Sequence, residues 1–143
     1  MANNKNYQSN IPQVKDALSR AEIRTLEAIG IFIDSETQAR CPVGEYPGGM
    51  VGGQLRASYT HKVNEAEKSV TNGSPLEYAV YVEKGTGKHA EGGRGRQTPW
   101  RFPLPDGSFR WTSGMKAQPH LTPAAEDNLN RIGRLAQEMM KID

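Results

Sequence analysis

Several features that would mark a particular class of protein are missing or scarce in this chain of 143 residues. A single cysteine, Cys41, excludes an intrachain disulfide, and nothing indicates an oxidising compartment. No apolar run approaches the roughly 18 residues that a membrane-spanning helix needs. The N-terminal residues also lack the apolar run of a secretory signal peptide. We therefore expect a protein that is made and kept in a cytoplasm, with no membrane partner.

Aromatic residues are scarce as well, and neither sign of charge is in clear excess. Only 7% of the residues are aromatic, against 15 glycines and 9 prolines, which predicts a modest core and much turn or loop. The length fits one domain, residues 1–143, with the polar residues 1–9 expected to be disordered. The 18 basic and 16 acidic residues nearly cancel. This balance argues against a dedicated nucleic-acid-binding protein.

Two helices are predicted from apolar residues at helical spacing. The first spans residues 11–40, because Asn10 can cap it, Pro12 suits its first turn, and Pro42 disfavours helical backbone at the preceding residue. The second opens at Thr122 and Pro123 and continues to the end of the chain. We expect five apolar side chains to be buried in the core: Leu18, Phe32, Leu55, Leu129 and Ile132.

Strands are predicted from alternation and from turn residues. Apolar residues alternate over 55–63, a turn follows at 64–67, and residues 68–71 form the second strand of a hairpin. Another hairpin joins 100–104 to 109–112 through Pro-Asp-Gly. Residues 77–84 fit either a strand or one or two helical turns, and we favour the helix. The fold class is therefore α+β, with the N-terminal and C-terminal helices packed on one face of a small antiparallel sheet.

Two glycine-rich segments, 42–54 and 85–98, are predicted to be loops. The second has five glycines and no apolar side chain larger than alanine, so it cannot offset its own ordering entropy. We expect residues 85–98 to be mobile.

Motifs that would indicate catalysis or a cofactor are incomplete. Gly87-Lys88 resembles a phosphate-binding loop, but Val82 stands where its first glycine belongs and His89 replaces the hydroxyl residue. The possible metal ligands, which show no ligand spacing, are Cys41, His61, His89 and His120. A cysteine–histidine nucleophile pair stays open, although the end of a helix disfavours a thiolate at Cys41. We expect no enzyme activity, no cofactor and no metal.

Basic and aromatic residues alternate between Lys84 and Arg110. Such a segment can hold a nucleic-acid backbone and stack on bases. The more common outcome is a solvated loop beside a hairpin whose aromatic side chains face the core. The candidate contacts for DNA or for a protein partner are Lys88, Arg94, Arg96 and Arg101.

Three segments together resemble a known family, the head–tail joining or tail-completion proteins of long-tailed phages. Gly53-Gln54-Leu55-Arg56-Ala57-Ser58 is similar to the family's Gly-x-Leu-x-x-Ser. The segment from Tyr78 to Thr86 is similar to its Tyr-Ala-x-Tyr-Val-Glu-x-Gly-Thr signature. Gln118-Pro119-His120-Leu121-Thr122-Pro123 resembles the opening of its last helix, with His120 in place of phenylalanine. The matching positions are Gly53, Leu55, Ser58, Tyr78, Ala79, Tyr81, Val82, Glu83, Gly85, Thr86, Pro119, Leu121 and Pro123.

The resemblance implies a structural role. It implies a ring of identical subunits, for which we expect six copies, that joins or completes the tail at the DNA-filled head. The implied partners are head-connector proteins, tail-terminator or tail-tube proteins, and DNA in the channel. The protein would occupy the host cytoplasm during assembly and then the virion. The residues agree with this role, since we expect Tyr78, Tyr81 and Val82 to anchor their segment to the core. The alternatives are a nucleic-acid-binding module of a mobile element and, less favoured, a small hydrolase or nuclease.

Overall fold

The computed structural model describes residues 8–44, 52–104 and 106–142. The expectations for residues 1–7 and for the middle of the 42–54 loop lie outside these ranges. The longest element, α1 (Ile11–Arg40), has the predicted bounds. Asn10 precedes it without a side-chain capping bond, and Cys41 takes extended backbone directly before Pro42. The restriction that proline imposes on the residue before it therefore ends the helix where predicted.

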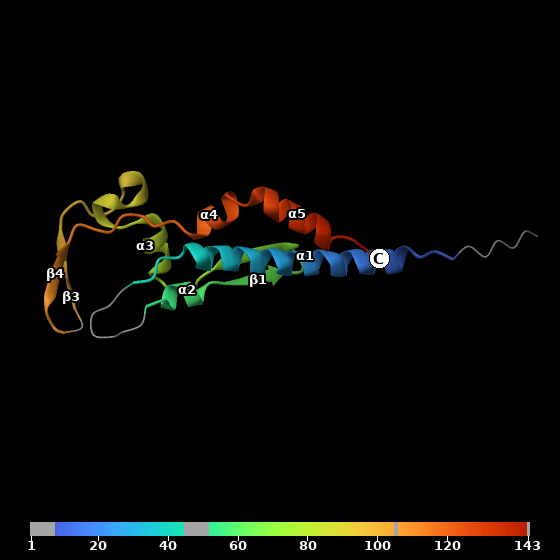
Figure 1. Cartoon of the computed structure of the whole chain (residues 1–143), viewed down its shortest axis with the longest axis horizontal. Coiled ribbons are helices and arrows are strands. Elements are labelled where there is room, and N and C mark those ends of the chain that lie inside the picture. The colour runs from blue at the N-terminus through green and yellow to red at the C-terminus, as the bar shows by residue number, and fades with distance from the viewer. Residues whose placement is uncertain (1–7, 45–51, 105, 143) are drawn as a thin grey trace, which may run out of the picture.

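Helix α1 forms the centre of the molecule. One side of it packs on the hairpin of β1 (Thr60–Asn64) and β2 (Ser69–Gly73), and another side packs on α4 (Leu121–Glu126) and α5 (Leu129–Met139). Figure 1 shows the elongated result, with α4 and α5 on one side of α1 and β1 on the other. The predicted α+β class is confirmed. Of the two helices predicted to pack on one face of the sheet, only α1 does so, because α4 and α5 pack on α1 instead.

The first hairpin is confirmed, but its first strand begins later than predicted. β1 and β2 pair antiparallel, with Val63 opposite Val70. The expected strand over 55–63 is wrong in its first half, because residues Gln54–Ser58 form a short helix, α2. Leu55 and Tyr59 are both buried. Their spacing of four fits one face of a helical turn as well as it fits alternation, which explains the error.

A second hairpin projects from the end of the molecule. Helix α3 (Ala79–Lys84), the helical alternative for this segment, is followed by two 3₁₀ turns, Gly87–His89 and Glu91–Gly93. Strands β3 (Trp100–Pro103) and β4 (Phe109–Thr112) then pair antiparallel, as predicted. These two strands pack mainly on each other and make few contacts with the other elements. We call residues 100–112 the arm, and Figure 1 shows it at the far end from the C-terminus.

The C-terminal helix is broken in two, against the prediction of one helix from Thr122. The helix start is Leu121, with His120 at the capping position. The break falls at Asp127 and Asn128. The buried Asn128 side chain donates a hydrogen bond to the Ala124 carbonyl at 2.9 Å. An asparagine that bonds to the preceding turn competes with regular helix, and this is the physical reason for the break.

The core is small, as the composition predicts. Five apolar residues are buried among the described ones: Ala21, Cys41, Leu55, Tyr59 and Ala124. Of the five predicted core residues, only Leu55 is among them, while Phe32 and Ile132 are half-buried. Leu18 is 41% exposed and Leu129 is 67% exposed, so both predictions are wrong.

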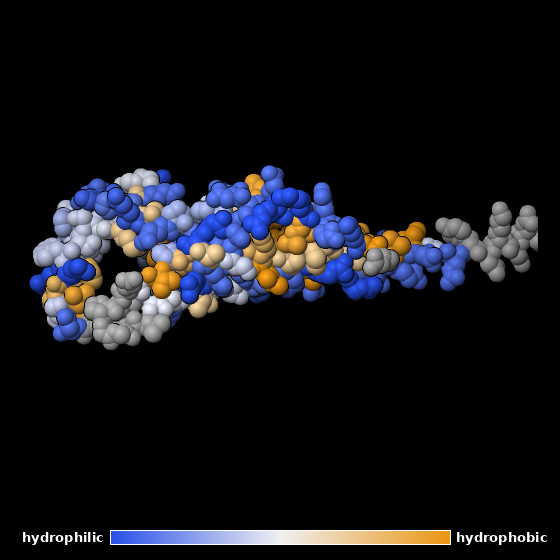
Figure 2. Space-filling model, viewed as in Figure 1, coloured by the Kyte–Doolittle hydropathy of each residue, from blue (hydrophilic) through white to orange (hydrophobic). Residues whose placement is uncertain are grey.

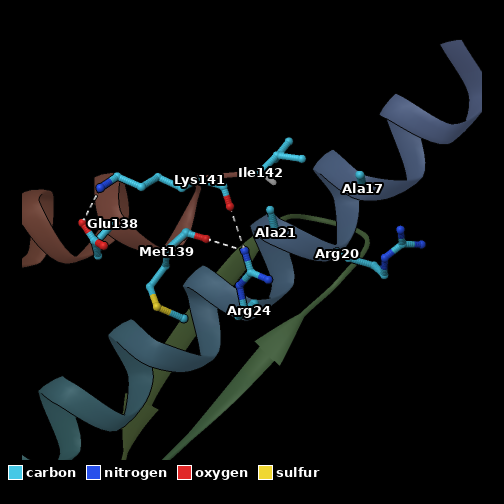
Figure 3. Close-up of a pocket in the computed structure, with 8 residues that line it drawn as sticks. All are labelled: Ala17, Arg20, Ala21, Arg24, Glu138, Met139, Lys141 and Ile142. Atoms are coloured by element: carbon cyan, nitrogen blue, oxygen red, sulfur yellow. Dashed lines mark hydrogen bonds and ion pairs between the residues drawn. The ribbon is translucent and has the colours of Figure 1, made fainter. Parts of the chain in front are cut away.

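An arginine in the middle of α1 binds the C-terminal end of α5. The Arg24 guanidinium in α1 donates hydrogen bonds to the carbonyls of Met139 at 2.8 Å and Lys141 at 3.2 Å. Figure 3 shows this side chain reaching from α1 to the end of α5, across an open groove. A cation at a helix C-terminus satisfies carbonyls that have no partner within the helix. The groove is therefore part of the packing of α5 on α1. In the described part of the chain, no helix combines the length and apolar character that crossing a membrane requires.

Candidate functional site

The three segments that resemble the phage family meet at one junction. Glu83, at the end of α3, accepts hydrogen bonds from the backbone N–H groups of His120 at 2.9 Å, Leu121 at 3.1 Å and Thr122 at 2.9 Å. The Gln118 N–H also donates to the Val82 carbonyl at 2.8 Å. The glutamate of the second segment therefore fixes the start of α4, which is the third segment.

The charge of Glu83 is favoured in this position. Burial opposes ionisation of the carboxyl group, but the hydrogen bonds from the backbone of His120, Thr122 and Leu121 outweigh it. They hold the pKa of Glu83 below its ordinary value. A negative charge at the first turn of a helix also interacts favourably with the helix dipole. This carboxylate is therefore an acceptor within the fold, and its lowered pKa suits neither a general acid nor a base near pH 7.

His120 is the fully buried centre of the junction. Its Nδ1 lies 2.8 Å from the Gln118 carbonyl and 3.1 Å from Glu83 Oε2, and its Nε2 bonds to the Tyr59 hydroxyl. Burial raises the pKa of Tyr59 to about 12, so the hydroxyl keeps its proton and is available as a donor. A neutral imidazole with its proton on Nδ1 satisfies all of these contacts. The histidine that replaces the family's phenylalanine therefore acts as a bonded core residue.

The first segment packs against the same junction. Gly53 precedes α2 with a positive φ of 103°, a conformation that favours glycine. Leu55, Tyr59 and Cys41 form the buried cluster, and the half-buried residues packed on it are Leu76, Ala79, Val82 and Leu121. Ser58 Oγ lies 2.6 Å from both the Leu55 carbonyl and Ser74 Oγ. Leu55, Ser58, Ala79, Val82, Glu83 and Leu121 thus share one structural unit.

Two signature residues have a different role from the one implied. Tyr78 and Tyr81 do not anchor α3 to the core, because both side chains are exposed. The apolar residues that pack inward from this helix are Ala79 and Val82. Pro119 is exposed, and Pro123 is a half-buried third residue of α4. A one-turn helix buries only one face, and the sequence pattern did not identify which one.

The glycines after α3 make a close backbone contact. Gly85 and Gly87 are buried and have φ of 78° and 60°. The Thr86 N–H donates to the Met115 carbonyl at 2.9 Å, and the Lys88 N–H donates to the Ser113 carbonyl at 3.1 Å. A Cβ at Gly87 would lie 2.2 Å from the Ser113 oxygen. The base of the 85–98 segment is therefore fixed to residues 113–115, which follow β4. The mobility expected for residues 85–98 stays a prediction.

The candidate contact residues lie together at this end of the molecule. Lys88, Arg94, Arg96 and Arg101 are all exposed. The Arg96 guanidinium lies 5.7 Å from the Trp100 ring centre, and that of Arg101 lies 4.7 Å from the ring centre of Phe109. The expectation that the aromatic residues of this hairpin face the core is wrong. Phe102, Phe109 and Trp111 are exposed, and Figure 2 shows apolar side chains at the surface of the arm.

A histidine between two carboxylates was not identified from the sequence. His61 on β1 bonds through Nδ1 to Asp34 at 2.6 Å and through Nε2 to Glu27 at 2.8 Å, both on α1. Asn72 on β2 donates to Asp34 at 2.7 Å and to the Gly30 carbonyl at 2.9 Å. The spacing of Glu27, Gly30 and Asp34 on one helix face was the available signal. This cluster joins the sheet to α1.

In the described ranges, no three His, Cys, Asp or Glu side chains are arranged so that they could hold a metal ion. His61 and His120 are separated into two clusters, each with its own hydrogen bonds.

Burial raises the pKa of the Cys41 thiol above its ordinary value, which disfavours the thiolate that a nucleophile needs. Gly87 and Lys88 lie in a 3₁₀ turn after an α-helix, so they lack the strand-to-helix setting of a phosphate loop.

No family model, no curated protein and no solved structure matches this chain.

Proposed function

We propose that this chain is a structural subunit of a phage neck, which assembles as a ring and joins or completes the tail at the head. The observation that carries the proposal is the junction of the three family-like segments. The residues of the resemblance that lie inside it are bonded or packed within the fold. The motif residues therefore stabilise the subunit itself, as expected for a family whose role is structural.

The distribution of polar and apolar groups supports the same role. In the described part of the chain, every buried polar side-chain atom has a hydrogen-bond partner. Large apolar side chains are exposed on α3 and on the arm, at one end of the molecule. Exposed aromatic residues beside arginines are typical of protein interfaces. The proposed location is the host cytoplasm during assembly and the neck of the virion afterwards.

The test is assembly in a phage that lacks this gene. We expect full heads and complete tails that remain separate, because no subunit closes the neck. Electron microscopy of the lysate would show both particles. Adding the purified protein to them should restore joined particles and infectivity. Normal joining without the gene would contradict the proposal.

A nucleic-acid-binding role is the second candidate, favoured by the exposed Lys88, Arg94, Arg96 and Arg101 beside aromatic rings. Replacing Arg94 and Arg96 with alanine distinguishes the two uses of this charge. If the arginines contact DNA in a neck channel, joined particles form but leak or eject DNA abnormally. If they contact protein, joining itself fails. A free DNA-binding module would instead bind duplex DNA with a steep dependence on salt and without any head or tail protein.

A further inference from the structure

The arm carries apolar side chains on both of its faces. In the antiparallel register, Arg101 lies opposite Trp111 and Pro103 lies opposite Phe109, so these four residues share one face. The other face carries Trp100 opposite Thr112, and Phe102 opposite Arg110. Trp111 is 69% exposed and Phe109 is 57% exposed. The face of Phe109 and Trp111 is therefore open to solvent, and on the other face Phe102 is 36% exposed while Trp100 is half-buried.

Such a hairpin needs a partner. Two strands alone are marginally stable in water, and exposed aromatic clusters on a protein surface mark contact sites. Tryptophan and arginine are also the residues that most often dominate the free energy of protein association. DNA contacting the arm would cover one face at most, and would leave the aromatic residues of the other face in water. Protein on both sides covers both.

The charge of the chain identifies the partner. Residues 84–116 contain seven basic and two acidic residues, a net charge of +5. The remaining eleven basic and fourteen acidic residues give the rest of the chain a net charge of −3. The segment 84–116, which includes the arm, is thus electrostatically complementary to the rest of another copy, which we call its body. Two basic residues and one acidic residue of this segment lie on the arm itself. An arm that binds a different surface on the next copy makes a head-to-tail contact, which closes into a ring when the rotation allows it.

We infer that the arm inserts between neighbouring copies of this chain, with Trp111 and Phe109 against the body of one of them. The inference rests on the proposed function, because it requires a subunit that assembles with itself. According to this inference, residues 100–112 make the contact between copies, and the basic residues around the arm attract the neighbouring copy.

Fluorescence gives a direct test, because the only two tryptophans of the chain, Trp100 and Trp111, both lie on the arm. In the full chain carrying Trp100→Phe, Trp111 is the single reporter. As protein concentration rises from micromolar to millimolar at low salt, we expect its emission to shift to shorter wavelength and its quenching by acrylamide to fall severalfold. Both changes should follow the sedimentation coefficient, and added salt should reverse them.

Two exposed apolar residues give a matched pair of variants, since Phe109 and Ile31 are each 57% exposed. Phe109→Ser should weaken self-association at least tenfold, whereas Ile31→Ser on α1 should leave it unchanged. Circular dichroism would establish that both variants keep the wild-type helix content. If Phe109→Ser changes that content, Arg101→Glu on the same face replaces it and should weaken association equally.

Three results would overturn the inference: oligomers that form with unchanged Trp111 emission, no self-association at millimolar concentration, or an emission shift with duplex DNA under conditions where the protein is monomeric. The last would assign the arm to DNA. Failure here differs from failure of the proposed function. If heads and tails still require this protein for joining, the proposed role in the neck stands, and a surface other than the arm makes the contact between copies.

Discussion

The Glu83 carboxylate accepts a hydrogen bond from the backbone N–H of Thr122 at 2.9 Å, although the two residues are 39 positions apart. Its other oxygen accepts from His120 and Leu121. One side chain at the end of α3 thereby satisfies three N–H groups at the start of α4. This contact fixes the point at which α4 and α5 begin their return along α1.

Replacing Glu83 with alanine should destabilise the protein by about 2–3 kcal/mol, since it removes the acceptor for backbone groups that are partly buried. Glu77→Ala is the matched control, because Glu77 is exposed and precedes the same helix. Its cost should stay within about 0.5 kcal/mol. Urea unfolding at neutral pH measures both. Equal costs for the two variants would mean that the junction contributes little.

The contribution of Glu83 should also depend on pH in a defined direction. Its pKa is lowered in the folded state, so the stabilisation is fully present above the ordinary glutamate pKa. It is lost as pH falls through the lowered folded value. The difference in unfolding free energy between wild type and Glu83→Gln should therefore shrink in acid. A difference that grows in acid would contradict this account.

His61 should make the packing of the first hairpin depend on pH with the opposite sign. Hydrogen bonds to Asp34 and then Glu27 raise the pKa of His61. Only the imidazolium donates from both ring nitrogens, so the stabilisation is full below the ordinary histidine pKa and falls as pH rises through the raised value. His61→Gln should cost about 1–2 kcal/mol at pH 6 and less at pH 9. The control is Lys62→Gln, an exposed neighbour on the same strand, which should show no such trend.

Two helical glycines should respond oppositely to alanine. At Gly30 a Cβ would lie 2.4 Å from the His61 ring, so Gly30→Ala should cost about 1–3 kcal/mol despite its better helix propensity. At Gly133 in α5 nothing lies within 4 Å of the added carbon. Gly133→Ala should therefore stabilise the protein by about 0.5–1 kcal/mol. Thermal unfolding compares the two. A stabilising Gly30→Ala would show that the ring of His61 is not held against α1.

Two leucines that the sequence predicts to be buried should differ when each is replaced by alanine. Leu55 is buried against Tyr59 and Cys41, so Leu55→Ala should cost about 2–4 kcal/mol. Leu129 is exposed, and its replacement by alanine should cost less than about 0.5 kcal/mol. A large loss of unfolding free energy in Leu129→Ala would mean that Leu129 is packed in the core, as the sequence predicts.

Local signals in the sequence were sufficient to predict most secondary structure. Pro42 ends α1 because it disfavours helical backbone at Cys41, and the turn residues Asp106 and Gly107 lie between β3 and β4. Long-range choices were not predictable in the same way. The exposure of Leu129 depends on how α5 rotates on α1, and the break at Asn128 depends on a bond that forms only in the folded chain.

The sequence predicted which residues belong to the junction but not how they bond to one another. The resemblance named Glu83 and Leu121, and no periodicity indicated that one caps the helix begun by the other. The cluster of His61, Glu27 and Asp34 was missed because its members come from two elements whose relative packing the sequence does not state. The arm's exposure was mispredicted because aromatic side chains usually face a core.

In vitro joining is the most direct test of the central claim. Heads and tails would be purified from a host infected with the phage that lacks this gene, and then mixed with the purified protein. We predict that infectious titre rises with wild-type protein and with Ile31→Ser, and that joined particles appear by electron microscopy. Heads and tails that join equally well with no added protein, or that never join when it is present, would contradict the assignment of this chain to the neck.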